Sequence, residues 1–353
     1  PLMRILDRYI ARAVVASSLL VLAVLMAMFT FFTLVEELDD VGQGSYGIGG
    51  ALLYVLLTLP RQAFEIMPMA ALIGSLLGLG ALAGNGELTV VRASGVSIQR
   101  IAGAVMKGGA VLMVLAAVLG EGVAPPLDRL AQDRRNLAMA TVEEEYGMWS
   151  RDGSAFINIR SFESPRHLRG VSIYEFDDEG RLRMATRAES ARYREDAWLL
   201  EGVRQSELTG DGVVVRHLER AKWASRLVPA LLGVARVEPE QLAVWGLARY
   251  VRYLEDTGQE SAPYRLSLWS KVMTPIATGV MILLALPFVF GPLRSVSVGS
   301  RMVVGVLVGI GFHIMNQTFM KMGLVYGFSP LASATAPTLL FAALALVMMR
   351  RVR

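Results

Sequence analysis

The chain has 353 residues, of which 54% are apolar and 19% charged, with a net charge of +4 at pH 7 and no cysteine. Its mean hydropathy is +0.46, which excludes an ordinary soluble protein unless the apolar residues are gathered in membrane-length segments. The lack of cysteine excludes a disulfide framework, a cysteine-ligated zinc site and a cysteine nucleophile.

The apolar residues do form such segments. Each segment has about 20 residues, which at a rise of 1.5 Å per residue is enough to cross the hydrocarbon core of a bilayer. The first is longer than the apolar part of a signal peptide, so we expect it to be retained. The sequence therefore predicts six transmembrane helices, at 13–35, 66–86, 101–120, 272–290, 302–320 and 331–349, with Lys107 as the one charge inside them.

Another apolar run, residues 48–60, could be counted as a seventh span. The loop before it is acidic and the loop after residue 86 is basic, so the chain between them must cross the membrane an odd number of times. We therefore interpret 48–60 as a half-helix on the outer side that leads into the second span, with a break at Pro60.

Charges in the short loops predict the orientation of the spans. The loop 36–47 holds four acids and no base, whereas the N-terminus, the loops after spans two and four, and the C-terminal tail are basic. The pattern predicts that both termini are cytoplasmic. The long insertion between spans three and four is then expected on the outer side.

The insertion, residues 121–271, holds 24 of the 31 acidic residues and 22 of the 35 basic ones, as expected for a domain in water. Residues 127–145 favour a helical stalk. Apolar residues then alternate with polar ones in short stretches, which predicts an all-β antiparallel sandwich or open jelly roll. The stretches are 155–159, 171–173, 182–184 and 213–215, with turn signals at 177–180, 195–196 and 210–212.

Three domains are predicted from these segments. Residues 1–126 would hold spans one to three, 127–266 the stalk and the jelly-roll domain, and 267–353 spans four to six. The whole is a polytopic α-helical membrane protein with an inserted β domain.

Motifs for bond-making chemistry are missing. None of the four lysines follows a glycine, which excludes a phosphate-binding P-loop. His167, His217 and His313 are far apart in sequence, and there is no Gly-x-Ser-x-Gly turn. The sequence therefore favours a protein that is not an enzyme and has no metal site.

Two cytoplasmic loops have features of docking segments. Gly86 and Gly95 bracket a short amphipathic helix at about residues 85–95, with Glu87, Val91 and Ser94 on one face. It would either dock in the groove of a partner or simply connect two spans. The matching loop after span four presents Arg294, which would either dock as well or serve as an orienting positive charge.

Several segments, in this order along the chain, together resemble the lipopolysaccharide-export permease family, nearer its G-type than its F-type members. They are Gly42-Gln-Gly-Ser-Tyr46, Glu87-Leu88 followed by Arg92-Ala-Ser-Gly95, Gly120-Glu-Gly-Val-Ala-Pro125, Leu268-Trp-Ser-Lys271 and Phe290-Gly-Pro-Leu-Arg294. The resemblance covers the whole chain. It implies a multi-pass protein of the bacterial inner membrane with a periplasmic β domain.

The resemblance also implies partners and a transport reaction. An F-type permease paralogue and a cytoplasmic ATPase dimer would join this chain, extract lipopolysaccharide from the outer leaflet of the inner membrane and pass it to a periplasmic bridge protein. The partner ATPase would bind ATP and magnesium, so no cofactor is expected here, and no nucleic acid. The expected contacts with the ATPase are Glu87, Leu88, Val91, Arg92 and Arg294.

A lipid with several acyl chains and phosphates needs an apolar cavity with cations at headgroup depth. We expect the phosphate contacts at Arg61, Arg134, Arg135, Lys271 and Lys321, which map to that depth. The alternative is that these residues are interfacial anchors or salt-bridge partners. Some family members have lysines at the outer end of span one, where this chain has Thr33, Asp39 and Asp40. Such acids could hold divalent cations that bridge to phosphate, although a solvated acidic loop is the commoner case.

Polar residues on span five form one helical stripe with His313, Asn316 and Gln317, and such residues face protein or a cavity. They would either bond neighbouring helices or, as the family implies, form a gate against span one. On span one, Phe29 and Phe32 would contact either membrane lipid or the acyl chains of the cargo.

Two other functions remain open at this stage. The chain could be a non-transporting scaffold that recruits periplasmic proteins through its β domain. It could also be a membrane enzyme acting on lipid, which the missing motifs disfavour.

Overall fold

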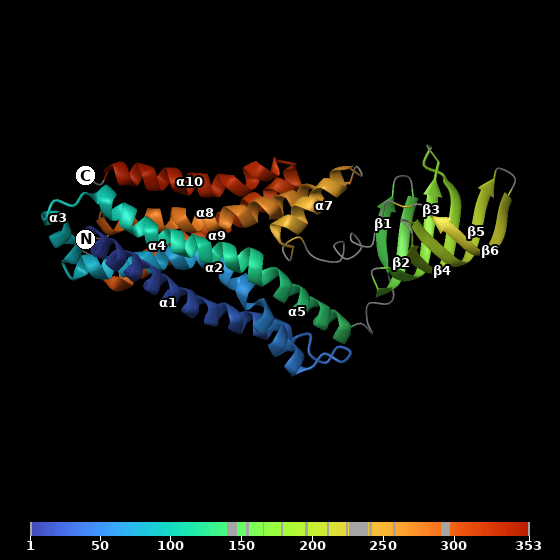
Figure 1. Ribbon diagram of the computed structural model, residues 1–353, viewed down its shortest axis with the longest axis horizontal. Coiled ribbons are helices and arrows are strands. Elements are labelled where there is room, and N and C mark those ends of the chain that lie inside the picture. The colour runs from blue at the N-terminus through green and yellow to red at the C-terminus, as the bar shows by residue number, and fades with distance from the viewer. Residues whose placement is uncertain are drawn as a thin grey trace.

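A computed structural model describes residues 2–139, 147–152, 155–164, 166–177, 179–194, 197–209, 212–223, 225, 239, 242–256, 259–290 and 297–351. Figure 1 shows a bundle of long helices with a β-sheet beyond one end. The short helix α3 (Glu87–Ala93) lies at the opposite end, where α1 begins and α10 finishes. These are termed the sheet end and the α3 end below.

Six helical segments in the described chain are long and apolar enough to cross a membrane, which confirms the predicted number. The helices α1 and α2 have 37 residues each, or about 56 Å at the helical rise, so both extend beyond the hydrocarbon core. The spanning helices are α1 (Leu2–Leu38), α2 (Ile48–Gly84), α4 (Ile98–Val118), α8 (Ala262–Phe290), α9 (Val298–Tyr326) and α10 (Pro330–Arg351).

The predicted break at Pro60 is wrong, because α2 is one continuous helix with Pro60 and Pro68 inside it. A proline removes one helical hydrogen bond, but neighbouring helices can support the backbone of a span through such a site. Here Thr58 and Ala63, on either side of Pro60, are buried against neighbours. Residues 48–60 are therefore continuous with the helix of span two.

The third span continues directly into the region of the predicted stalk. After α4 the chain passes through a π-helical turn, η1 (Leu119–Val123), into α5 (Ala124–Met139). Pro125 and its neighbour Pro126 follow this turn, and their missing N–H groups explain why the hydrogen-bond ladder is interrupted there. Stalk residues 140–145 lie outside the described residues.

Small residues let the helices of the bundle approach closely. A Cβ on Gly74 would lie 2.3 Å from the Cα of Ser18, which places α1 directly against α2. A Cβ on Gly309 would lie 2.7 Å from the Cγ of Met69, which does the same for α9 and α2. Close packing through small residues is the usual way in which helices associate in lipid.

The insertion forms one six-stranded antiparallel sheet with the order β1-β2-β3-β4-β5-β6, which confirms the predicted all-β domain. The described strands follow chain order, so the described part of the sheet contains no crossover of a jelly roll. One face is buried, with Ile157, Ile159 and Trp198 fully covered. The strands are β1 (Met148–Asp152), β2 (Ala155–Ser164), β3 (His167–Phe176), β4 (Leu182–Arg194), β5 (Ala197–Thr209) and β6 (Gly212–Trp223).

The turn between β3 and β4 is as predicted: the Gly180 N–H donates to the Asp177 carbonyl over 3.0 Å, and Gly180 has a φ of 76°. The predicted turns at 195–196 and 210–212 lie mostly outside the described residues. After the sheet, helix α7 (Val244–Asp256) packs against α8 and returns the chain to the bundle.

Candidate functional site

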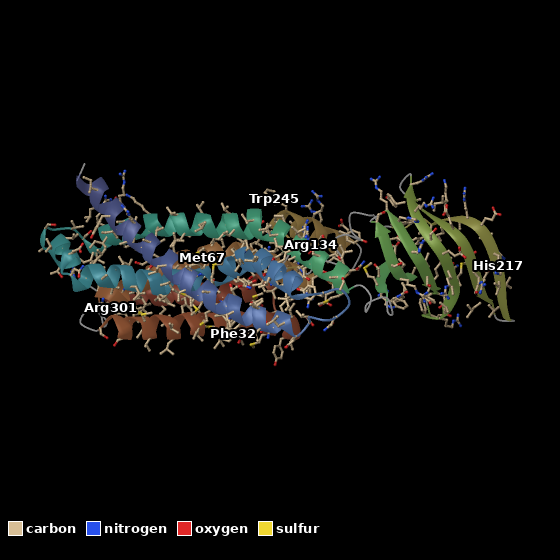
Figure 2. The ribbon with its side chains drawn as sticks, turned by 90° about the horizontal axis from the view of Figure 1, so that it is seen from below. Phe32, Met67, Arg134, His217, Trp245 and Arg301 are labelled. Carbon is tan, nitrogen blue, oxygen red and sulfur yellow. The ribbon has the colours of Figure 1, made fainter. Side chains whose placement is uncertain are left out.

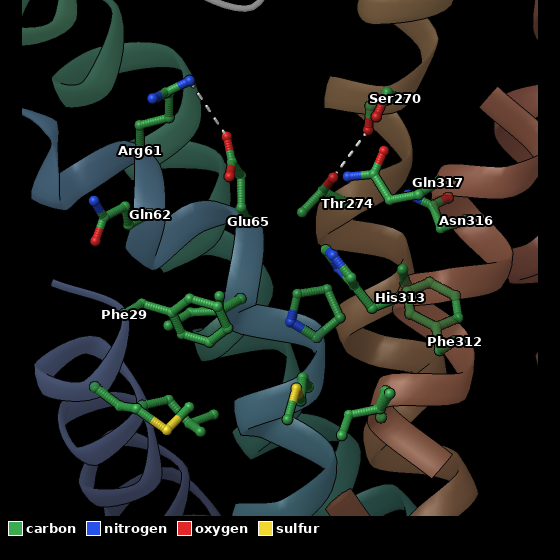
Figure 3. A pocket seen from close by; sticks show the side chains of 18 of the residues that line it. Phe29, Arg61, Gln62, Glu65, Ser270, Thr274, Phe312, His313, Asn316 and Gln317 are labelled. Carbon is green, nitrogen blue, oxygen red and sulfur yellow. Dashed lines mark hydrogen bonds and ion pairs between the residues drawn. The ribbon is translucent and has the colours of Figure 1, made fainter. Parts of the chain in front are cut away.

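A cavity of about 700 Å³ opens between α1, α2, α8 and α9, toward the sheet end of the bundle. Its walls are mainly apolar, with Phe29 from α1 and Phe312 from α9 on facing sides (Figure 3). The polar residues on its lining come from the same four helices, except Thr338, which comes from α10: Thr33, Glu36, Glu37, Tyr54, Arg61, Gln62, Glu65, Ser270, Thr274, His313, Asn316, Gln317 and Thr338.

The polar stripe of α9 faces this cavity, as expected for polar residues inside a span. His313, Asn316 and Gln317 all line it, opposite Arg61 and Glu65 of α2 (Figure 3). Of the two phenylalanines predicted on α1, Phe29 lines the cavity. Phe32 lies outside it and is 55% exposed. A gating role for these residues stays a prediction.

The structure brings one of the five predicted cations to the cavity, and that cation has counter-charges. Arg61 lines the cavity with its Nε 3.3 Å from Asp128 Oδ2 and its guanidinium 3.9 Å from Glu65 Oε1. Asp128 is buried on α5. Arg61 therefore ties α2 to α5 as well as facing the cavity.

Arg135 lies in a polar cluster that joins α5 to the outer part of α1. Its Nε donates to Glu37 Oε1 over 2.7 Å, its guanidinium also pairs with Asp40, and it lies over the ring of Tyr54 at 5.5 Å. The Tyr46 hydroxyl donates to the same Glu37 oxygen over 2.6 Å. Burial and the Glu37 carboxylate raise the pKa of Tyr46, so its proton is held firmly at neutral pH.

The remaining predicted cations do not line the cavity. Arg134 and Lys321 are exposed, and Lys271 is half-buried. Sequence position fixes the depth of a residue along a span but leaves its direction open, and neighbours on a helix point about 100° apart. This explains why Arg134 faces solvent while Arg135 faces α1.

The mouth of the cavity carries more acid than base. Glu36, Glu37 and Glu65 line it together with one cation, Arg61. Asp40 is engaged by Arg135 and by Gln43, whose Nε2 donates to it over 3.0 Å. Among the described residues no group of three or more histidine or acidic side chains is arranged to hold a metal ion.

Sequence reasoning missed the cluster of Glu37, Tyr46, Tyr54 and Arg135. Its members are separated by up to 98 positions, so no local pattern could join them. The one signal was Tyr46 itself, the last residue of the Gly42–Tyr46 segment. The Ser45 N–H, next to it, donates to the Ala138 carbonyl over 2.9 Å and fastens this loop to the end of α5.

The predicted short helix exists as α3, and Gly86 and Gly95 at its ends have positive φ angles of 78° and 90°. Its expected docking residues face partly inward. Leu88 is 4% exposed and belongs to the hydrophobic core of the helical bundle. Val91 is partly buried and packs against the same core. Val90, by contrast, is 70% exposed.

Two polar contacts hold α3 to the rest of the bundle. The Tyr9 hydroxyl of α1 donates to Glu87 Oε2 over 2.8 Å. The Arg92 guanidinium lies 6.0 Å from the centre of the Phe290 ring at the end of α8. Glu87 and Arg92 thus join α3 to two spans. Arg294, the other expected docking residue, lies outside the described residues.

Comparisons with known proteins agree with this architecture. Residues 8–351 match the family described as lipopolysaccharide export system permease LptF/LptG. The chain is 36% identical over 353 residues to the lipopolysaccharide export system permease protein LptG of Escherichia coli K12, with 98% of each chain covered. It is 34% identical over 341 residues to the Haemophilus influenzae LptG, with 95% of each covered.

The similarity to F-type relatives is partial. The Escherichia coli K12 LptF protein matches at 28% identity over 164 residues, or 45% of each chain. The predicted preference for the G-type is therefore confirmed. The six apolar helices and these relatives also establish a multi-pass protein of the inner membrane. The chain belongs to the lipopolysaccharide export permease LptF/LptG family.

Proposed function

We propose that this chain is the G-type half of an export complex in which a separate cytoplasmic ATPase drives extraction of lipopolysaccharide from the outer leaflet. The observation that carries the proposal is the cavity of about 700 Å³, apolar in its walls and polar at its mouth, between α1 and α9. Such a shape suits acyl chains below and a polar headgroup above. In this arrangement the sheet is periplasmic, and both termini are cytoplasmic.

The ATPase would act through α3. Its exposed side, around Val90, is the surface we assign to the ATPase, while buried Leu88 fixes α3 on the bundle. The contacts of Glu87 with Tyr9 and of Arg92 with Phe290 would carry a displacement of α3 to α1 and α8. Both helices line the cavity, so its width would change with the nucleotide state of the ATPase.

To bind phosphate, some of the cations would have to exchange their carboxylate partners for phosphate oxygens. Arg61 and Arg135 are already paired with carboxylates, so each would leave an acid when it binds a phosphate. Lys321 and Arg134 are exposed at the same end of the bundle. The F-type paralogue would cover the open side of the cavity and supply further cations, because the mouth of this half is acidic.

Photocrosslinking in cells tests the proposal. Probes at Phe29 and His313, on facing sides of the cavity, should give adducts with lipopolysaccharide, and inactivating the ATPase should change their yield. Val347 on α10 is the matched control, because it is 52% exposed but does not line the cavity. If Phe29 and His313 give no more adduct than Val347 in an assembled complex, the chain is a scaffold for periplasmic partners instead.

A further inference from the structure

Helix α7 is a surface helix at the sheet end of the bundle. Its 13 residues extend about 20 Å, which is too short to cross a bilayer. One side is covered, since Leu247, Tyr250, Val251 and Leu254 are buried, and its neighbour is α8. The other side faces outward, and the lipid-export cavity does not reach it.

Contacts at both ends of α7 fix its position along the long axis of the bundle. The Val244 N–H donates to Glu121 Oε2 over 2.7 Å, which ties its first turn to η1, where the third span leaves the bundle. Near its last turn, Glu255 pairs with Arg265 of α8 at 3.2 Å. The helix therefore lies at the level where one span ends and another begins, the level of lipid headgroups.

Aromatic side chains mark the same level. The rings of Tyr250 and Tyr264 meet edge to face at 4.7 Å, and Tyr253 lies 6.2 Å from Tyr250. Tyrosine and tryptophan are enriched at the interface between membrane and water, where an apolar ring and a polar group are both accommodated. Tyr264 is the third residue of the span α8.

The outward side of α7 carries an aromatic residue and two bases. Trp245 is 80% exposed (Figure 2), and Arg249 and Arg252 follow it at i+4 and i+7, both exposed. Within the described part of the chain no ion pair is formed by either arginine. Arg129 of α5 lies near the first turn of α7, because its guanidinium is 4.0 Å from the position that a Cβ on Gly246 would take.

We propose that α7 is a binding site for anionic phospholipids of the leaflet at the sheet end. Trp245 lies among the acyl-chain ends nearest the headgroups, while Arg249 and Arg252 bind headgroup phosphates, which guanidinium groups can contact through two parallel hydrogen bonds. A helix with a basic polar side and a tryptophan is typical of membrane-interface helices. This site is distinct from the export cavity and does not depend on the proposed cargo.

Tryptophan fluorescence tests the position of Trp245. The purified full-length chain is placed in nanodiscs of phosphatidylcholine with phosphatidylglycerol, free of lipopolysaccharide, with bromine atoms on the upper part of the acyl chains. The emission lost in Trp245→Phe is the contribution of Trp245, and the proposal requires bromine to quench it. Absence of quenching of that component would overturn the proposal.

Lipid enrichment tests the two arginines. Phosphatidylglycerol retained by the chain is measured against phosphatidylcholine for the natural chain and for the double variant Arg249→Gln/Arg252→Gln. The expected loss is on the order of fivefold per arginine at low salt. Arg183→Gln/Arg216→Gln removes the same charge from the sheet and should change nothing. Equal retention in the natural chain and the α7 variant would contradict the proposal.

Discussion

Single glycines on α2 determine how closely α1 can approach it. At Gly74 an added Cβ would lie 2.3 Å from a backbone atom of Ser18, which cannot move aside like a side chain. Gly74→Ala should therefore separate the two helices and lower the free energy of unfolding by about 1–3 kcal/mol. Thermal unfolding in detergent measures the change. Gly311→Ala is the control, since nothing lies within 4 Å of a Cβ there, and equal stability of the two variants would refute this packing.

Adjacent arginines on α5 have different surroundings and should behave differently. Arg135→Ala removes the counter-charge of Glu37, whose side chain is 8% exposed. Because the Arg135 side chain is itself 26% exposed, we expect a loss of about 2–3 kcal/mol, less than for a fully buried pair. Arg134→Ala should leave stability unchanged, since its side chain is exposed. The comparison is made by thermal unfolding, and equal effects would show that the Arg135 cluster does not stabilise the protein.

Residue types and depth could be read from the sequence, whereas partners could not. Arg61 was expected at the outer end of span two and does line the cavity. Its contact with Asp128 joins α2 to a helix more than 60 positions later, and nothing local in the sequence indicates that pair. The same limit applies to Arg135 and Glu37.

Helix α3 has an inward and an outward side. Substitutions on the inward side should lower stability, and substitutions on the outward side should weaken ATPase binding. Val90→Asp alters a side chain that is 70% exposed, so the permease should stay folded while ATPase binding falls. Leu88→Ala opens space beneath α3, since Leu88 is 4% exposed, and should cost about 2–5 kcal/mol. Co-purification of the ATPase and thermal unfolding separate the two effects. Normal ATPase recovery with Val90→Asp would remove α3 from the coupling surface.

The hairpin of β3 and β4 should lose stability in acid. The Arg181 backbone N–H donates to Asp177 Oδ1 over 2.8 Å, and this bond together with the Arg181 guanidinium holds the pKa of the Asp177 carboxyl below its usual value. A lowered folded pKa means that the stabilisation is present above the unfolded pKa, about 4, and disappears as the pH falls through the folded value.

Hydrogen exchange in this hairpin measures the effect, after correction for the intrinsic pH dependence of exchange. In the natural chain, the backbone amides near Gly180 should become less protected from exchange as the pH drops below about 4. Asp177→Asn cannot titrate, so its protection should stay level across that range. Identical profiles for the two chains would mean that Asp177 does not stabilise the turn.

At the scale of elements, the periodicity of apolar residues predicted that a helix or strand exists better than it predicted where that element begins and ends. The six spans and the strands β2, β3, β4 and β6 lie where apolar runs and alternation placed them, whereas β1 and β5 were not predicted. The interruption at Pro60 was wrong because a rule from water-exposed helices was applied to a helix supported by neighbours. The order of the strands was not predicted, because alternation marks a strand without showing which strand it pairs with; the sheet pairs consecutive strands.

At the scale of the whole molecule, the two ends of the helical bundle differ in the elements that they carry and in the charge of their loops. The sheet lies beyond one end of the bundle, and α3 lies at the other (Figure 1). Six spans return the chain to the side from which it started, so the first residues of α1 and the last of α10 share an end. The acidic loop 36–47 lies toward the sheet end and the basic tail at the α3 end, as the proposed orientation with the α3 end in the cytoplasm requires.

This orientation can be tested with single cysteines, because the natural chain has none and every label would report the introduced site. Gln43→Cys, in the acidic loop, should react with a membrane-impermeant maleimide once the outer membrane is made permeable. Ser94→Cys, after α3, should react only when the inner membrane is opened as well. Both residues are exposed, so burial cannot explain a difference between them. The reverse pattern would place α3 outside the cytoplasm, where no ATPase could reach it, and would overturn the coupling role of α3 together with the orientation.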